Sequence, residues 1–353
     1  MSTRKYRNKN FKKQSIKRAN FSNDTEHQGT SSESENNESS GSGISDISES
    51  SNNHQMNSLS PDHITLPVNT KLSQISMLGS HDAGTYAYSR KKNDGKLNSM
   101  GALFPFAFKT QNLTLREQAE KGVKYFDIRV KKRKDGSFGF IHGGSIAGGN
   151  AVNDVNSLLE HTKTDKRNFY LLKFVIEDDK INKGTTKSDG DAFFEQTLGL
   201  DESNQIIKAD LDDQNLGSAT VNVLEKNKNL AIMVHKYKGN NKNYWDYKSQ
   251  TNTKWPNSTS WKKTAEKITK FHKDQAPNDL INIMQTNMPA ITKNIFTMGR
   301  LKKLLINGAP GIADAIDKLE HPGVISGDYI GHAQSATERF KNWISRKNNK
   351  ITK

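Results

Sequence analysis

Seven residues with acid–base or anion-binding side chains lie inside apolar runs of the sequence or directly after them. They are His81, Asp82, Asp127, Arg129, His142, Lys173 and Asp328. Two imidazoles can act as base and acid near neutral pH, and carboxylates behind them can orient the rings. A guanidinium can stabilise negative charge developing on a phosphate. Brought together, these residues could move protons around a phosphate without a metal or a cysteine, and the chain has no cysteine.

Two of these positions are hard to explain as ordinary structural residues. Gly79 and Gly84 bracket the His81–Asp82 pair in "ISMLGSHDAGTY" (75–86), and glycines let the backbone approach a ligand closely. Lys173 interrupts the apolar run "YLLKF", where a lysine needs a partner or a polar cavity. The alternative interpretation is a set of structural histidines and one ordinary arginine–aspartate ion pair.

The elements that must position these residues alternate along the chain from Leu66 onward. β-rich apolar runs occupy 72–78, 123–130, 138–142, 169–176, 230–234, 280–284 and 323–326, with 219–224 as a candidate eighth strand. Helical patterns occupy 113–122, 151–162, 191–200, 259–274 and 336–347. Continuous apolar strands indicate a sheet buried on both faces, and alternation with helices predicts an α/β fold, a (β/α) barrel. A doubly wound open sheet is the alternative.

A parallel barrel would gather the polar residues listed above at one end. The carboxyl ends of its strands share one face, and active sites of such barrels lie there. We therefore expect residues far apart in the sequence to converge into one site.

Composition divides the chain of 353 residues into parts. The net charge of +15 is the sum of +8 from residues 1–20, −7 from residues 21–60 and +14 from the rest. The acidic segment is rich in Ser, Asn, Glu and Gly and cannot bury enough apolar surface to fold. We expect a disordered tail over 1–64, with a basic arm and an acidic linker, then a catalytic barrel over 65–345 and a basic tail over 346–353.

The basic balance predicts an anionic partner such as nucleic acid, anionic lipid or a phosphorylated substrate. The basic arm has few aromatic residues, which argues against a single-strand nucleic-acid binder. No run approaches the roughly 18 apolar residues of a membrane span, and no secretory leader is recognisable. Ser2 in place of glycine excludes N-myristoylation.

Three motifs in order then point to a family. "ISMLGSHDAGTY", "REQAEKGVKYFDIRV" and "DGSFGFIHGG" together resemble the X domain of bacterial phosphatidylinositol-specific phospholipase C. "YLLKF" and "GVISGDYIG" extend the resemblance over about residues 66–345. It implies a distorted TIM-like barrel that cleaves phosphatidylinositol to diacylglycerol and inositol 1,2-cyclic phosphate, without a metal or other cofactor.

The resemblance also implies a role for each catalytic residue. His81 would be the general base, oriented by Asp328, and His142 the general acid, supported by Asp82. Arg129 would bind the phosphate. Calcium-dependent relatives of the barrel have a carboxylate where this chain has Arg129, which is why we expect no metal.

Four further residues would bind the substrate. Asp127 would support the phosphate-binding cluster, Lys173 and Lys236 would contact the inositol, and Trp255 would stack under its ring. The residue two positions before Trp255 is Thr253, where the family has an acidic residue, so the chemistry is better supported than the headgroup.

An aromatic loop is the expected membrane contact. "MGALFPFAFKTQ" (100–111) contains Phe104, Phe106 and Phe108, and Trp245 is a second candidate. A buried lid over the barrel mouth is the alternative for this loop.

We therefore expect a monomeric enzyme that acts at a phosphatidylinositol-containing membrane surface and binds no nucleic acid. It would be secreted or delivered from a bacterium without a recognisable leader, with the cytoplasm as the alternative location. The rival functions are cleavage of another phosphodiester on the same barrel, and a non-catalytic barrel that binds anionic lipid.

Overall fold

The computed structural model describes residues 66–88, 108–181, 186–198, 203–273, 279–289, 309–332 and 335–352. All of them belong to one unit, residues 57–353. The predicted disordered tail over 1–64 lies outside the described residues. Within the described ranges, no helix is long and apolar enough to cross a membrane.

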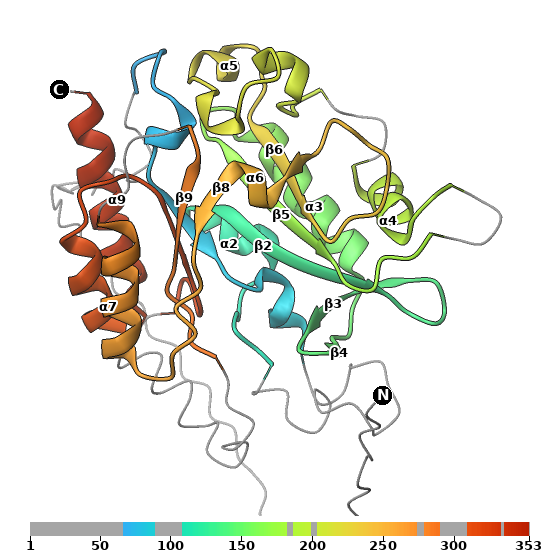
Figure 1. The fold of residues 1–353 in the computed structure, drawn as a ribbon. Coiled ribbons are helices and arrows are strands. Elements are labelled where there is room, and N and C mark those ends of the chain that lie inside the picture. The colour runs from blue at the N-terminus through green and yellow to red at the C-terminus, as the bar shows by residue number, and fades with distance from the viewer. Residues whose placement is uncertain are drawn as a thin grey trace, which may run out of the picture. The chain divides into compact units, whose positions relative to one another are not determined.

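A parallel sheet of eight strands forms the centre of the fold (Figure 1). Its strands, in the order in which they pair, are β7 (Trp245–Asp246), β6 (Leu230–His235), β5 (Tyr170–Ile176), β2 (Val123–Lys132), β1 (Met77–Ser80), β10 (Val324–Gly327), β9 (Ile281–Gln285) and β8 (Thr251–Thr253). The edge strands β7 and β8 are consecutive in the chain, are linked by α6 (Tyr247–Gln250), and do not pair. The sheet is therefore a curled half-barrel, and the predicted distorted (β/α) barrel is confirmed.

Side chains alternate between the two faces of this sheet. On β2, Phe126 and Ile128 belong to a cluster that packs under the helices, whereas Tyr125 belongs to a second cluster on the concave face. The same alternation places Leu171 on the concave face of β5. Because successive residues of a strand point to opposite faces, Asp127 is on the concave side with Tyr125.

The region 138–142 forms a strand, as predicted, but outside the barrel. β3 (Phe138–His142) pairs antiparallel with β2 and with β4 (Ser145–Ile146), and Figure 1 shows this hairpin beside the end of β2. The prediction of a strand over 219–224 is wrong, because this segment contains the short helix α5 (Asn222–Glu225). The two-residue β7 and the three-residue β8 were too short for the sequence pattern to reveal.

The longer helices lie where the 3.6-residue periodicity predicted them. They are α2 (Leu115–Glu120), α3 (Ala151–Thr164), α4 (Asp189–Thr197), α7 (Trp261–His272) and α9 (Thr337–Ile351). Short 3-10 turns are η1 (Leu72–Gln74), η2 (Ala83–Ala87), η4 (Lys208–Leu211) and η5 (Leu216–Ser218).

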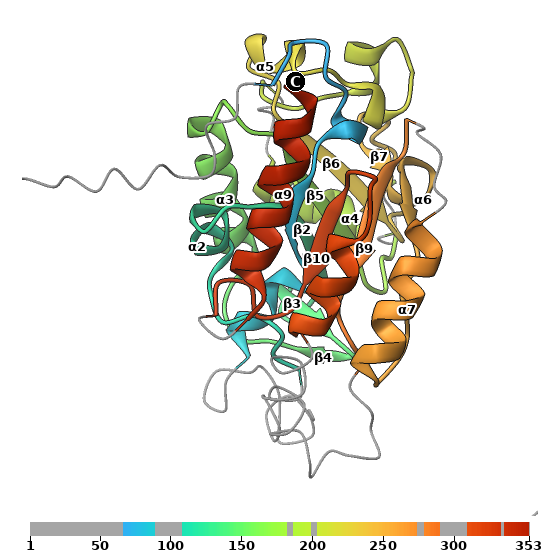
Figure 2. The ribbon, with the colours of Figure 1, turned by 90° about the vertical axis from the view of Figure 1, so that its left-hand side faces the viewer.

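The predicted boundary at residue 345 is wrong, because it falls inside α9. The Asn348 side chain is buried, accepts a hydrogen bond from Ser76 N at 2.8 Å and donates one to Ser76 O at 3.1 Å. Figure 2 shows α9 running alongside β1. Most of the predicted basic tail is therefore the last turns of a packed helix.

Candidate active site

The predicted site residues converge towards the carboxyl ends of the strands, with Asp127 and Lys173 in the middle of β2 and β5. The residues and the strands that carry or precede them are His81 (after β1), Asp127 and Arg129 (β2), His142 (β3), Lys173 (β5) and Asp328 (after β10). Asp127 and Lys173 are direct register partners, so they lie side by side on the concave face.

His81 is oriented from both sides of its ring. Its Nδ1 lies 2.8 Å from Asp328 Oδ1, and its Nε2 lies 3.2 Å from Nδ2 of Asn287. An amide NH₂ can only donate, so the ring fits as the neutral tautomer with its proton on Nδ1. Nε2 then presents a lone pair to the site, as a general base requires.

The pKa of His81 is raised above its ordinary value. Burial alone lowers it, because burial disfavours the imidazolium, but the Asp82 and Asp328 carboxylates raise it by more. Arg129 opposes them in part. The ring is thereby made a stronger base than an isolated histidine.

Arg129 joins two buried carboxylates. Its Nε lies 2.5 Å from Asp82 Oδ1, and one terminal nitrogen, Nη2, lies 3.1 Å from Asp127 Oδ2 and 3.3 Å from Nε2 of His81. Burial lowers the pKa of Arg129, but Asp127 and Asp82 raise it by more, so the guanidinium stays charged. For Asp127, burial raises the pKa, while Lys173 and Arg129 hold it well below its usual range.

His142 faces His81 across this cluster. The two ring centroids are 6.4 Å apart, with the planes perpendicular. Nδ1 of His142 lies 2.8 Å from the carbonyl oxygen of Phe108, and Nε2 lies 3.2 Å from Asp82 Oδ2. Since a carbonyl oxygen can only accept, Nδ1 donates to Phe108, and the ring is held with Nε2 facing Asp82 and the site, where a general acid would act.

The glycines around the His-Asp pair have a packing reason. A Cβ on Gly79 would lie 2.8 Å from the Tyr125 ring and 2.8 Å from Val324, and a Cβ on Gly84 would lie 2.1 Å from the ring of Phe140. Asp82 between them has a left-handed φ of 43°. The glycines therefore let β2 and β3 approach the loop closely enough for His142 to reach Asp82.

Lys173 has the ion-pair partner expected for a lysine inside an apolar strand. It is buried, with Nζ 3.0 Å from Asp127 Oδ1 and 4.3 Å from the centre of the Tyr247 ring. His235, at the end of β6, packs against the same ring at 6.2 Å. Burial and then the charge of Lys173 lower the pKa of His235, which favours a neutral ring on this wall.

Two of the predicted inositol-binding residues lie outside this buried cluster. Lys236 is half exposed, has a left-handed φ of 60°, and pairs with Glu177 at 2.8 Å. Trp255 follows β8 and is 42% exposed. Both are at the carboxyl ends of strands, but no contact joins either of them to His81 or Arg129 among the described residues.

The aromatic loop is only partly described. Phe108 is half-buried, stacks on Tyr88 at 5.7 Å and meets the His142 ring edge-on at 6.0 Å, so it forms a wall of the site. This packing favours the lid interpretation for that one residue. Phe104 and Phe106 lie outside the described residues. The prediction for Trp245 is wrong, because this side chain is 1% exposed and donates to the Ile206 carbonyl.

One cluster has the spacing of a metal site. His81, Asp82 and Asp127 each offer a ligand atom, and these atoms lie within 4.8 Å of one another. The Arg129 guanidinium contacts both carboxylates, so a fixed cation already occupies their negative field. The donor set therefore fits the guanidinium better than a metal ion, and metal independence stays a prediction.

Three residues of the site were missed in the sequence. Asn287 is buried against His81, Gln111 donates from Nε2 to the carbonyl oxygens of His81 and Gly327 at 2.9 Å each, and Tyr247 lies under Lys173. Amides and a phenol do not suggest acid–base chemistry, which explains the omission. A signal did exist for Asn287, because it closely follows the apolar run 280–284 as His81 follows 72–78.

The fold and the site define an α/β half-barrel with an acid–base cluster at the carboxyl ends of its strands. Its solved neighbours include phosphatidylinositol-specific phospholipase C from Staphylococcus aureus, with a TM-score of 0.56, 14% identity, and coverage of 79% of this chain and 94% of that one. The enzyme of the same name from Listeria monocytogenes gives a TM-score of 0.56 at 17% identity, over 80% of this chain and 96% of that one. The resemblance predicted from the motifs is thus confirmed for the fold.

Sequence comparison gives a more local likeness. The chain is 35% identical over 116 residues to human "PI-PLC X domain-containing protein 2", and the match covers 29% of this chain and 37% of that protein. The mouse protein of the same name is 35% identical over 89 residues, with 26% of its length covered. The chain therefore spans less than two fifths of the length of either relative. No family model matches it.

Proposed function

We propose that this protein is a phosphatidylinositol phosphodiesterase of the phospholipase C type. The observation that carries the proposal is the pair of opposed imidazoles, His81 and His142, with the Arg129 guanidinium beside them. Asp328 lies against His81, and Asp82 lies beside both rings. A protein that only binds lipid has no need of two such groups.

The proposed reaction is an intramolecular phosphoryl transfer. The inositol 2-hydroxyl attacks phosphorus as His81 Nε2 takes its proton, and a new P–O bond closes the 1,2-cyclic phosphate. The bond from phosphorus to the glycerol oxygen breaks, and His142 gives that oxygen a proton to release diacylglycerol. Arg129 stabilises the negative charge of the pentacoordinate phosphorus. Atoms and protons balance without a water or a metal.

The neighbourhood of the pair supports this substrate class. Lys173 and Asp127 form a buried, hydrogen-bonding ion pair on the concave face, suited to the hydroxyls of a polyol. The solved neighbours of the fold are described as phosphatidylinositol-specific, which supports the headgroup by analogy.

The test is a headgroup panel with purified protein. Vesicles containing phosphatidylinositol, phosphatidylcholine, phosphatidylglycerol or sphingomyelin are followed by phosphorus NMR. We expect a five-membered cyclic phosphate from phosphatidylinositol alone. An acyclic phosphomonoester from another lipid would support a different phosphodiesterase, and vesicle binding without turnover would support a non-catalytic barrel.

We also propose that catalysis is metal-independent. Activity should survive excess EDTA, because Arg129 supplies the positive charge that a cation would otherwise provide. Arg129→Lys should be strongly impaired, since one ammonium cannot contact Asp82, Asp127 and a phosphate with the same fork. Loss of activity in EDTA with recovery on adding calcium would contradict the mechanism.

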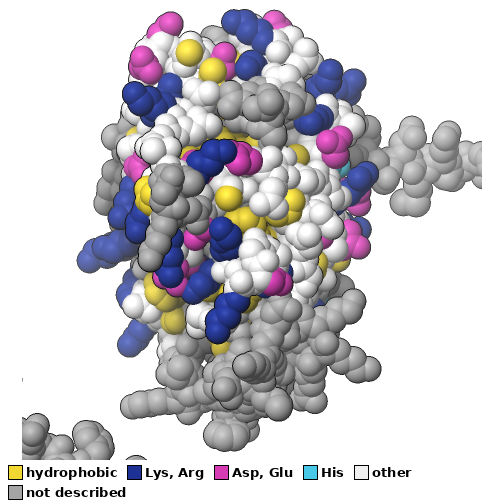
Figure 3. All heavy atoms as spheres, turned by 90° about the vertical axis from the view of Figure 1, so that its right-hand side faces the viewer, with side chains coloured by type: hydrophobic (Ala, Val, Ile, Leu, Met, Phe, Trp, Pro, Cys, Tyr) yellow, Lys and Arg dark blue, Asp and Glu magenta, His cyan; other side chains and the backbone are white. Residues whose placement is uncertain are grey.

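The proposed partner is a membrane surface, bound peripherally by a monomer that is exported from a bacterium. Figure 3 shows Lys and Arg side chains spread over one face of the molecule, with Asp and Glu among them. Such a surface is attracted weakly to an anionic leaflet. Sedimentation with vesicles of graded anionic content tests the partner, and analytical ultracentrifugation tests the monomer.

A further inference from the structure

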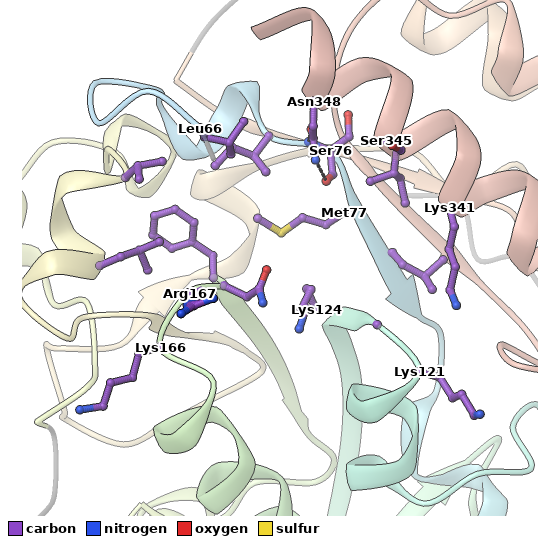
Figure 4. Close-up of a pocket in the computed structure, with 18 of the residues that line it drawn as sticks. Leu66, Ser76, Met77, Lys121, Lys124, Lys166, Arg167, Lys341, Ser345 and Asn348 are labelled. Carbon is purple, nitrogen blue, oxygen red and sulfur yellow. Dashed lines mark hydrogen bonds between the residues drawn. The ribbon is translucent and has the colours of Figure 1, made fainter. Parts of the chain in front are cut away.

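A large cavity lies at the opposite ends of the strands from the active site. Its volume is about 740 Å³, and it is bordered by residues 75–78 at the start of β1, 122–124 at the start of β2 and 166–169 before β5. One face of α9 closes it from the side (Figure 4). None of the proposed catalytic residues lines it, so it is a separate site.

The floor of this cavity is apolar. Met77 and Phe169 are buried there, and Leu66, Leu224 and Ile344 are partly buried around them. The volume falls within the range of roughly 300–1,000 Å³ found for small-molecule sites. Apart from Phe169, the apolar side chains that line the cavity are aliphatic, and the rest of the lining is polar or charged. The aliphatic part suits a hydrocarbon chain better than a nucleobase or another flat ring.

The rim of the cavity is cationic. Lys121, Lys166 and Arg167 are exposed, and within the described ranges their side chains make no ion pair or hydrogen bond. Figure 4 shows Lys121 on one side of the cavity and Lys166 and Arg167 on the other.

The remaining charges do not cancel this excess. Lys124 is held by Asp165 at 2.8 Å, and Lys341 by Glu338 at 3.2 Å. Of the two lining acids, Glu120 is already paired with Arg116 at 3.0 Å, and Glu225 is exposed. An anion at the rim would therefore meet cations that lack partners of their own.

We propose that this cavity binds a single-chain anionic amphiphile, namely a free long-chain fatty acid. The hydrocarbon chain would lie on the floor formed around Met77 and Phe169, and the carboxylate would meet Lys166, Arg167 or Lys121 at the rim. Burial of the chain supplies affinity in proportion to apolar area, and the cations select the head.

The source of the ligand follows from the position of the cavity. The proposed reaction requires the carboxyl ends of the strands to face the membrane, and this cavity opens at their other ends. A lipid seated in a bilayer cannot reach both, so the ligand is an amphiphile in solution. The conclusion that the ligand comes from solution rests on the proposed function, whereas binding of a fatty acid in this cavity does not.

The experiment is calorimetric titration of the full chain with sodium dodecanoate below its critical micelle concentration. We expect one saturable site, weakened about tenfold or more by Lys166→Glu combined with Arg167→Glu. The matched control is Lys263→Glu with Lys270→Glu, on the exposed side of α7, which makes the same change of charge and should leave binding unchanged.

Three further titrations separate head, tail and cavity. Dodecan-1-ol should bind more weakly because it lacks the charge, and acetate should not bind because it lacks the chain. Leu224→Trp should abolish binding by filling the cavity, with an unchanged circular dichroism spectrum. Absence of saturable heat would overturn the proposal, as would equal weakening by both charge reversals. So would saturable binding of an acidic peptide, such as residues 31–50, that dodecanoate does not displace.

Discussion

At the scale of single residues, the Asp82 carboxylate contacts both the guanidinium and the imidazoles of the site. Asp82 forms an ion pair with Arg129 through one oxygen and lies beside both imidazoles, His81 and His142, through the other. The His81–Asp82 pair is therefore the centre of the cluster and not one end of it.

The first prediction concerns the two imidazoles. His81→Ala and His142→Ala should each lower turnover by about 10²–10⁴-fold, the usual worth of general acid–base catalysis. The double variant should lose far less than the product of the two effects, because both groups act in one step. Turnover of phosphatidylinositol vesicles measures this, and near-normal activity of either single variant would contradict the assignment.

Asp328 should control the acid limb of the pH profile. A general base acts only when it is deprotonated, so the acid limb of kcat/KM follows the pKa of His81. Asp328 raises that pKa and therefore places the limb at higher pH. In Asp328→Asn that pKa falls, and the acid limb of kcat/KM should move to lower pH while the plateau drops. A limb that stays in place would show that another group controls it.

Asn287 should have the opposite effect on the same limb. Its amide donates to Nε2 only in the neutral ring, so it stabilises the basic form of His81. Removing the donor in Asn287→Ala should raise the pKa of His81 and move the acid limb of kcat/KM to higher pH. Opposite shifts from Asp328→Asn and Asn287→Ala would distinguish positioning from a general loss of structure.

At the scale of elements, the β3–β4 hairpin decides where the proposed general acid lies. The hairpin folds back along β2 with Val130 opposite Phe140, which returns His142 towards the site. The Phe140 ring packs onto the backbone at Gly84, so the loop after β1 and the hairpin fit together at this contact.

Gly84→Ala tests that contact. The added Cβ would lie 2.1 Å from the Phe140 ring, so the hairpin must move. Overpacking of this kind costs about 1–3 kcal/mol of stability. Turnover should fall more than the melting temperature suggests, because His142 is displaced from Asp82. Phe140→Leu in the Gly84→Ala background should restore part of the activity, and additive losses would contradict the coupling.

At the scale of the whole molecule, membrane binding and catalysis should separate within the aromatic loop. Phe104→Ser with Phe106→Ser should weaken sedimentation with vesicles and leave hydrolysis of soluble inositol cyclic phosphate intact, given the preference of aromatic residues for membrane interfaces. Phe108→Ser should do the reverse, because Phe108 packs on His142. Equal loss of both activities in the first variant would favour a lid.

The sequence by itself determined the fold class and predicted most of the residues that converge in the candidate site. The period of the apolar runs located six barrel strands, because burial on both faces leaves a continuous apolar signature. The rule that active groups lie at strand ends in such barrels then selected His81, Asp127, Arg129 and Asp328, and the lysine inside an apolar run selected Lys173. Both inferences rest on short-range patterns that are written along the chain.

The tertiary structure decided what depends on contacts between distant segments. The edge strands β7 and β8 are two and three residues long, too short for any periodicity. The hairpin that carries His142 runs antiparallel to β2, so this residue reaches the site by packing at Gly84 and not by barrel symmetry. Asn287, Gln111 and Tyr247 gain their roles only from neighbours far away in sequence, since an amide or a phenol carries no chemistry of this kind until a partner is placed beside it.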